Sequence, residues 1–152
     1  METENLGIEN EIFDTLLRKA EGIPFYRFLG LQIASLGKGS AVIEVETPPE
    51  YGNVDNSTHG GVIMAAADAA MAMAVRSLGA NTTTVQLNVL FMRHGVIGEK
   101  ITAEGRVVKA GRRILFCNAS VRCGEQEIAM VEGTFFRTGD LLAPKEAQDK
   151  SK

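Results

Sequence analysis

The chain carries HGGVIMAAADAAMAMAV at residues 59–75, and between Val62 and Val75 only Asp68 is polar. Alanine and methionine favour helices, no proline interrupts the segment, and Gly79 suits a left-handed C-terminal cap. Because the apolar residues lie all round the cylinder, we expect this helix to be buried on every side. A buried, unpaired carboxylate is costly, so Asp68 either has a specific partner or serves chemistry.

The rest of the chain supplies a sheet to wrap this helix. The apolar run is shorter than the about 20 residues of a membrane span and has a charge at its centre, so we expect no membrane segment. Apolar spacing predicts an amphipathic surface helix at residues 9–20. Alternating patterns and short turn signals predict a first hairpin and then an antiparallel meander, with strands at 29–34, 40–46, 82–92, 100–109, 113–122 and 127–137. The expected fold is α+β: a long buried central helix wrapped by an antiparallel sheet of about six strands.

Composition predicts a single globular domain. The chain has 152 residues, is 45% hydrophobic and carries a formal net charge of -3, which gives no basic face for nucleic acid. We expect one domain over residues 1–140, including the N-terminal helix, and a disordered polar tail over 141–152. The acidic N-terminus lacks a signal-peptide pattern, which predicts a cytoplasmic protein. Cys117 and Cys123 are too few and too irregularly spaced for disulfides or zinc, so we expect core thiols and no metal site.

A set of spaced residues then carries a family resemblance. The set comprises Asn53-x5-His59-Gly60-Gly61-x6-Asp68, Thr84-Val-Gln-Leu-Asn88, Phe91-Met-Arg93, Gly98 and Gly111-Arg112. Over about residues 24–138 it resembles the hotdog-fold acyl-CoA thioesterases, closest to the phenylacetate-degradation type related to 4-hydroxybenzoyl-CoA thioesterases. The resemblance implies a hotdog fold and hydrolysis of an acyl-CoA to free acid and CoA. It also implies a homodimer or homotetramer with composite sites, and no cofactor, since coenzyme A is part of the substrate.

Thioester chemistry explains the residues around the helix start. Hydrolysis needs a polarised carbonyl, a nucleophile and a place for the oxyanion charge. The first N–H groups of a helix lack partners and sit at the positive end of its dipole, so Gly60 and Gly61 can present them to a carbonyl as an oxyanion hole. Asp68 then acts either as general base on water or as a direct nucleophile. The sequence leaves both routes open.

The resemblance gives three other residues supporting catalytic roles. Asn53 and His59 orient the thioester or the loop that holds it, and Thr84 holds Asp68 or the attacking water. Each also has a plainer interpretation: a turn residue for Asn53, a helix-entry residue for His59 and ordinary strand propensity for Thr84.

Arginines near the predicted strand ends are candidates for substrate binding. Arg93, Arg112 and Arg113 have guanidinium groups that suit a CoA phosphate, although in most proteins such residues are solvated hairpin charges. Two positions depart from the family pattern. Asn56 stands where the family usually has glycine, and asparagine tolerates the left-handed conformation. His94 stands where proline is common, which frees a backbone N–H at the strand exit.

The spacing of Gly60 and Asp68 predicts a second subunit. Eight residues of helix span about 12 Å, whereas reacting atoms must approach to about 3–3.5 Å. A two-fold partner whose Asp68 faces this chain's Gly60 resolves the mismatch, so we expect a dimer or tetramer. The helix methionines are most simply core filling; the second interpretation is that methionine and alanine line a pocket for a medium-chain or aryl acyl group. The sequence leaves acyl carrier protein open as the thiol carrier. One alternative function is a non-catalytic acyl-CoA binding or sensing module. Another is a hydratase or dehydratase, which would need a histidine and an acid in a different order around the helix.

Overall fold

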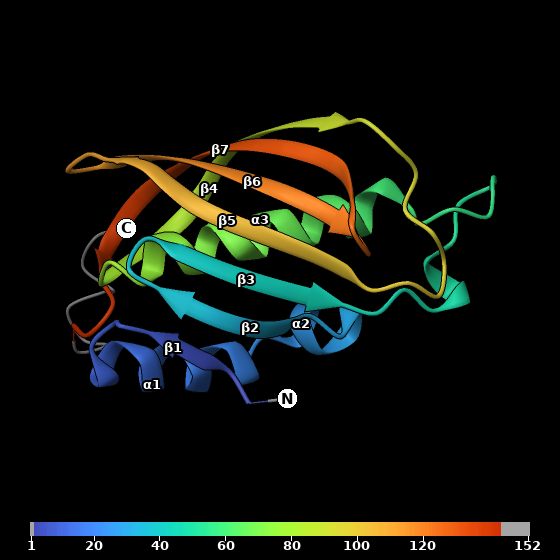
Figure 1. Ribbon diagram of the computed structural model, residues 1–152. Coiled ribbons are helices and arrows are strands. Elements are labelled where there is room, and N and C mark those ends of the chain that lie inside the picture. The colour runs from blue at the N-terminus through green and yellow to red at the C-terminus, as the bar shows by residue number, and fades with distance from the viewer. Residues whose placement is uncertain (1, 144–152) are drawn as a thin grey trace.

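The computed structural model describes residues 2–143 and shows a long helix, α3 (Gly60–Arg76), in the concave face of a curved sheet (Figure 1). The sheet has seven strands in the order β1-β2-β3-β5-β6-β7-β4. The β1–β2 pair is parallel and the other pairs are antiparallel. The α+β prediction is confirmed, with seven strands in place of about six. The remaining elements are β1 (Glu4–Leu6), α1 (Asn10–Glu21), α2 (Pro24–Leu29), β2 (Gln32–Gly37), β3 (Ser40–Val45), the 3-10 helix η1 (Pro49–Tyr51), β4 (Ala80–Phe91), β5 (Ile101–Ala110), β6 (Ile114–Cys123) and β7 (Gln126–Asp140).

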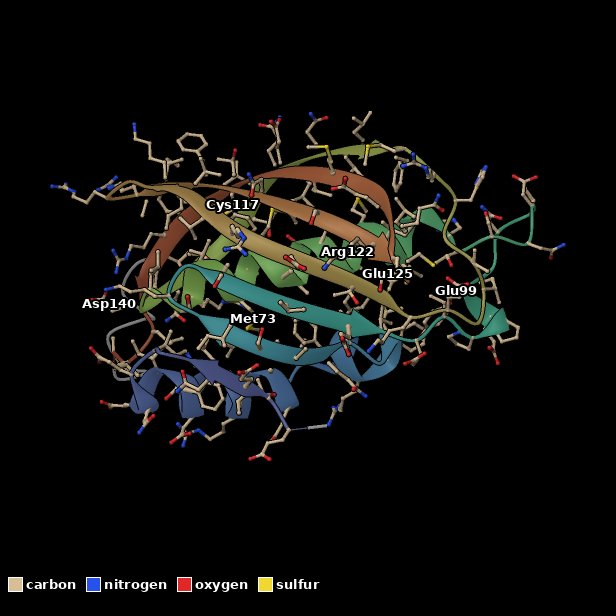
Figure 2. The ribbon with its side chains drawn as sticks, in the orientation of Figure 1. Met73, Glu99, Cys117, Arg122, Glu125 and Asp140 are labelled. Carbon is tan, nitrogen blue, oxygen red and sulfur yellow. The ribbon has the colours of Figure 1, made fainter. Side chains whose placement is uncertain are left out.

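Small residues let the sheet close tightly round α3. A Cβ at Gly105 of β5 would overlap the backbone of Ala70, and a Cβ at Gly133 of β7 would lie 2.9 Å from the Met71 sulfur. Glycine at both positions therefore allows close contact between strand and helix. Met71, Met73 and Cys117 are all buried in the core that results, and Figure 2 labels the last two. Most of α3 is buried, as the composition predicts, but one face is not: Met64 is 40% exposed, and Ala65 and Asp68 are partly exposed.

The predicted meander is correct for β5, β6 and β7 but wrong for β4. Instead of pairing with β5, β4 crosses to the far edge of the sheet and pairs with β7, while β5 pairs with β3. The connection that contains Gly95 and Gly98 is therefore a crossing loop and not a hairpin. It is held by Thr58 N–H donating to Gly95 O at 2.8 Å and by Gly98 N–H donating to Thr47 O at 2.8 Å. Strands from both sides are needed to enclose a helix that is apolar all round, which explains the crossing.

Two short elements lie outside the sequence prediction. α2 lies between the predicted surface helix and the first predicted strand, which it overlaps only at Leu29, and β1 precedes α1. With six residues α2 is too short to show a helical period, although Pro24 at its first turn and Gly30 after its end, with a φ of 65°, are helix boundary signals. α1 agrees with the predicted surface helix. Its Lys19 Nζ donates to Asn81 Oδ1 at 3.3 Å, which places α1 beside the start of β4.

The end of the folded region differs slightly from the predicted domain boundary. The polar tail is predicted to start at residue 141, but Leu141 is buried and its N–H donates to Gly79 O at 2.9 Å. Gly79 has a φ of 80°, the left-handed cap conformation predicted for it. Residues 144–152 of the predicted tail lie outside the described residues. Within the part that is described, every helix is too short or too polar to cross a membrane.

Candidate active site

The N-terminus of α3 presents one free backbone donor. His59 caps the helix: its Nδ1 accepts the Gly61 N–H at 2.9 Å, and its carbonyl accepts the Val62 N–H at 2.9 Å. No acceptor among residues 2–143 takes the Gly60 N–H. Of the two predicted oxyanion donors, Gly60 is therefore free and Gly61 is already engaged by His59. Because Nδ1 accepts, a neutral His59 ring carries its proton on Nε2.

A side chain would be crowded at both glycines of this helix start. A Cβ at Gly60 would lie 3.1 Å from Cζ of Phe91, whose ring covers that side of the helix. A Cβ at Gly61 would lie 3.0 Å from the Nδ1 of His59 and would disturb the cap. A side chain at either position would therefore displace the groups that shape the site.

Asn53 organises the loop that leads into α3. Its Oδ1 accepts three hydrogen bonds, from Asp55 N–H at 2.9 Å, Ser57 N–H at 3.1 Å and the Ser57 hydroxyl at 3.1 Å. Asn56 has a φ of 54°, so it adopts the left-handed conformation expected at this glycine position. The Asn53 side chain thus holds the loop. Its Nδ2 has no acceptor within the described range and remains able to donate.

Asp68 faces the edge strand β4. Thr84 Oγ1 donates to Asp68 Oδ1 at 2.8 Å. Further along β4, the residues that face α3 are odd-numbered. The strand register shifts between Thr84 and Gln86, and this bulge lets the even-numbered Thr84 point toward α3 as well. Burial raises the pKa of the Asp68 carboxyl, opposed by the hydrogen bond from Thr84 and by the charge of Arg76. A carboxylate with a raised pKa is a better proton acceptor.

One helix therefore carries two reactive features that a single carbonyl cannot contact together. Gly60 begins α3, and Asp68 lies two turns along the same helix. Eight residues correspond to about 12 Å of rise. The structure of one chain thus places a free backbone donor and an acid on one helix, too far apart to act on the same carbonyl.

Comparison with known proteins identifies the family. The model of the Thioesterase superfamily matches residues 55–130, about half the chain, from the loop before α3 into β7. The chain belongs to the thioesterase superfamily. It is a thioester hydrolase with the hotdog fold, as the sequence motifs predict.

Individual relatives agree with this membership. The chain is 28% identical over 120 residues to a putative esterase of Archaeoglobus fulgidus, covering 78% of each chain. It is 29% identical over 115 residues to the acyl-coenzyme A thioesterase PaaI of Escherichia coli, covering 75% of this chain and 82% of that one. The solved structure of the E. coli PaaI protein from the phenylacetic acid degradation operon superposes with a TM-score of 0.83 at 24% identity, over 88% of this chain and 98% of that one.

The three candidate arginines of this thioesterase-superfamily chain lie at different ends of the molecule. Arg93 comes two residues after Phe91, whose ring lies against Gly60, and its Nη1 donates to Glu127 O at 3.0 Å. Arg112 and Arg113 occupy the β5–β6 turn. The strand that leads into this turn lies near the C-terminal end of α3, because a Cβ on Gly39 would contact both Val107 of β5 and Leu78, which follows α3. The 17 residues of α3 span about 25 Å. Within one chain, the structure thus brings Arg93 near Gly60 and leaves the other two arginines far away.

Two residues near Asp68 were not found from the sequence. Tyr26 of α2 has its pKa raised to about 12, mainly by burial, with the Asp68 charge adding to the rise and Arg76 opposing it. Both α2 and the last turn of α3 therefore place polar groups within electrostatic range of Asp68. No local pattern signals the position of Tyr26, because it depends on where α2 lies relative to α3; Arg76 is eight residues further along the same helix as Asp68.

The remaining candidate groups are metal ligands and the two cysteines. Across residues 2–143, no three His, Cys, Asp or Glu side chains gather as a metal site would require. Cys117 and Cys123 are free and buried, as predicted for core thiols, and burial raises the pKa of Cys117 to about 12.

Proposed function

We propose that this protein hydrolyses acyl-CoA thioesters with a medium-chain or aryl acyl group, giving the free acid and CoA. One observation carries the proposal: the unengaged Gly60 N–H at the start of α3, combined with Asp68 on the same helix and hydrogen-bonded to Thr84. The first feature suits a developing oxyanion and the second suits activation of water. The name of the E. coli relative, an acyl-coenzyme A thioesterase, supports CoA as the thiol carrier.

In the proposed reaction the Gly60 N–H donates to the thioester carbonyl oxygen. The positive end of the α3 dipole stabilises the negative charge that develops when this carbon becomes tetrahedral. His59 keeps the helix start in shape by accepting the Gly61 N–H, and Asn53 keeps the preceding loop in shape. Their proposed roles are positional.

Asp68 supplies the attack. As general base it removes a proton from water, whose oxygen bonds to the carbonyl carbon; as nucleophile it bonds to that carbon itself, and water then cleaves the anhydride. In both routes the C–S bond breaks and the CoA sulfur leaves with the electron pair, then takes up a proton. Thr84 donates to Oδ1, which leaves Oδ2 to act.

We propose that each site combines Gly60 of one subunit with Asp68 of its partner. The edge strand β4 supports a second copy, because its twelve residues carry no charge and no proline, the usual protections of a free edge. Val85 and Phe91 on this strand are 60% and 50% exposed in the single chain. Two-fold pairing through β4 would cover them and bring the two Asp68–Thr84 pairs to the interface.

The arginines and cysteines complete the proposal. Arg93 lies on the Gly60 side and is the proposed contact for a CoA phosphate, whereas Arg112 and Arg113 would reach substrate only from another subunit.

Two free thiols fit a reducing compartment, and we propose a cytoplasmic location.

The test is release of free thiol from a panel of acyl-CoAs that spans acetyl, octanoyl, phenylacetyl and benzoyl groups. The proposal predicts turnover that is fastest with the larger apolar acyl groups and lost in Asp68→Asn. Tight binding of acyl-CoA without thiol release from any member would instead identify a binding module and refute hydrolysis.

A further inference from the structure

An aromatic groove lies beside the start of α3. Its volume is about 460 Å³, within the range typical of small-molecule sites. α2 contributes Phe25 and Phe28, η1 contributes Tyr51, and the floor is formed by Leu29 and Val62. Phe28 is 77% exposed and Phe25 is 52% exposed. Two exposed phenylalanines side by side on a short helix are costly to leave in water, which favours a ligand there.

The groove borders the helix start that carries the proposed oxyanion donor. His59 and Gly61, the residues on either side of Gly60, belong to its lining. A carbonyl oxygen bound by the Gly60 N–H would therefore lie close to the groove. Tyr51 donates through its hydroxyl to Phe28 O at 3.1 Å, which ties η1 to α2 and fixes the groove's two aromatic walls relative to each other.

We propose that this groove is the acyl pocket, and that Phe28 and Phe25 select an aryl or other bulky apolar acyl group. The inference rests on the proposed thioester hydrolysis and specifies its substrate. The lining favours the acyl group over the pantetheine arm of CoA, because pantetheine carries two amides and a hydroxyl that need hydrogen-bond partners. The groove offers few: the Tyr51 hydroxyl already donates to Phe28 and the His59 Nδ1 already accepts from Gly61, which leaves the His59 Nε2 and the Glu50 carboxylate.

A negative charge at the rim of the groove restricts the charge of the acyl group that can bind. Glu50 is exposed and lies in the lining. Its carboxylate would repel an acyl group that ends in a carboxylate, such as succinyl, while leaving a neutral ring unaffected. The selected class is therefore uncharged, apolar and large enough to contact both phenylalanines.

Phenylacetyl-CoA and acetyl-CoA form a matched substrate pair, since they differ only by a phenyl ring. We would measure kcat/KM for both with the wild type, Phe28→Ala and the control Phe116→Ala, a 46% exposed phenylalanine on β6 that does not line the groove. Loss of an apolar wall should lower the phenylacetyl-to-acetyl ratio roughly tenfold in Phe28→Ala. The ratio should be unchanged in Phe116→Ala. Unfolding midpoints near the wild type would verify that both variants fold.

Two results would overturn the proposal. One is an unchanged ratio in Phe28→Ala, including an equal loss with both substrates, which indicates the pantetheine arm; the other is an equal fall of the ratio in Phe116→Ala. Calorimetric binding of the same two CoA esters separates the pocket from the chemistry. If the wild type releases no thiol but binds phenylacetyl-CoA more tightly than acetyl-CoA, and Phe28→Ala loses this preference, the proposed hydrolysis fails and the acyl pocket stands. Absence of any such preference in the wild type refutes the pocket.

Discussion

Mixing two inactive variants tests whether each site is built from two subunits. Asp68→Asn removes the acid. Gly60→Val places a branched side chain beside the free N–H, where a Cβ alone would already lie 3.1 Å from Cζ of Phe91, so it crowds the space a thioester carbonyl must enter. Each homodimer should be inactive, because each of its sites has one lesion. In a heterodimer with composite sites, one site has both lesions and the other has none.

The recovered activity can be calculated. Complete random exchange of equal amounts gives about half heterodimers, each with one intact site of two, so activity should approach roughly a quarter of wild type per subunit if the sites are independent. The assay is thiol release after co-refolding, with heterodimers counted by native mass spectrometry. Sites contained within one chain would give no recovery. Inactive mixtures with proven heterodimers would refute a composite site, and with it the inference drawn from the about 12 Å between Gly60 and Asp68.

Two further predictions concern the groups around these residues. Thr84→Val removes a hydrogen bond that lowers the pKa of Asp68 while the burial that raises it remains; the acidic limb of kcat/KM should therefore move to higher pH in a pH–rate profile, and an unmoved limb would show that Asp68 is not the titrating base. Asn53→Ala removes the acceptor of three hydrogen bonds in the loop before α3 and should cost about 1–3 kcal/mol in urea unfolding, with a fall in kcat/KM; unchanged unfolding and a lost rate would instead indicate direct substrate contact through Nδ2.

The central helix was predictable because its signals are local. Composition, the absence of proline and Gly79 decide α3 and its end, and alternation decides where most strands lie. The partner of β4 was not predictable in the same way. Strand pairing between residues about 50 apart, such as Thr84 with Phe135, depends on how the sheet closes round the helix. Short loops around Gly95 favoured a hairpin that the structure does not form.

The candidate site also has a part that local sequence predicts and a part that depends on tertiary packing. The motif spacing led to Gly60 and Asp68, because both lie on one helix whose geometry is regular. It could not show that His59 occupies the Gly61 N–H, which depends on the ring's orientation. Nor could it show the wall of Phe25 and Phe28, because that wall forms only when α2 packs beside α3. Residues that act through tertiary contacts leave no periodic signal.

The most direct test of the central claim is turnover by Asp68→Asn with its best acyl-CoA, measured beside its thermal unfolding. Asparagine keeps an oxygen that can accept the Thr84 hydroxyl but cannot take a proton from water or attack, so kcat should fall by about 10²-fold or more. Folding raises the pKa of Asp68, so its stabilising contribution is present at low pH and is lost as pH rises through the folded-state pKa. At neutral pH the variant should therefore unfold at the wild-type temperature or above. Near wild-type turnover, or a lower unfolding temperature together with only a modest loss of rate, would contradict the account and make Asp68 a structural acid.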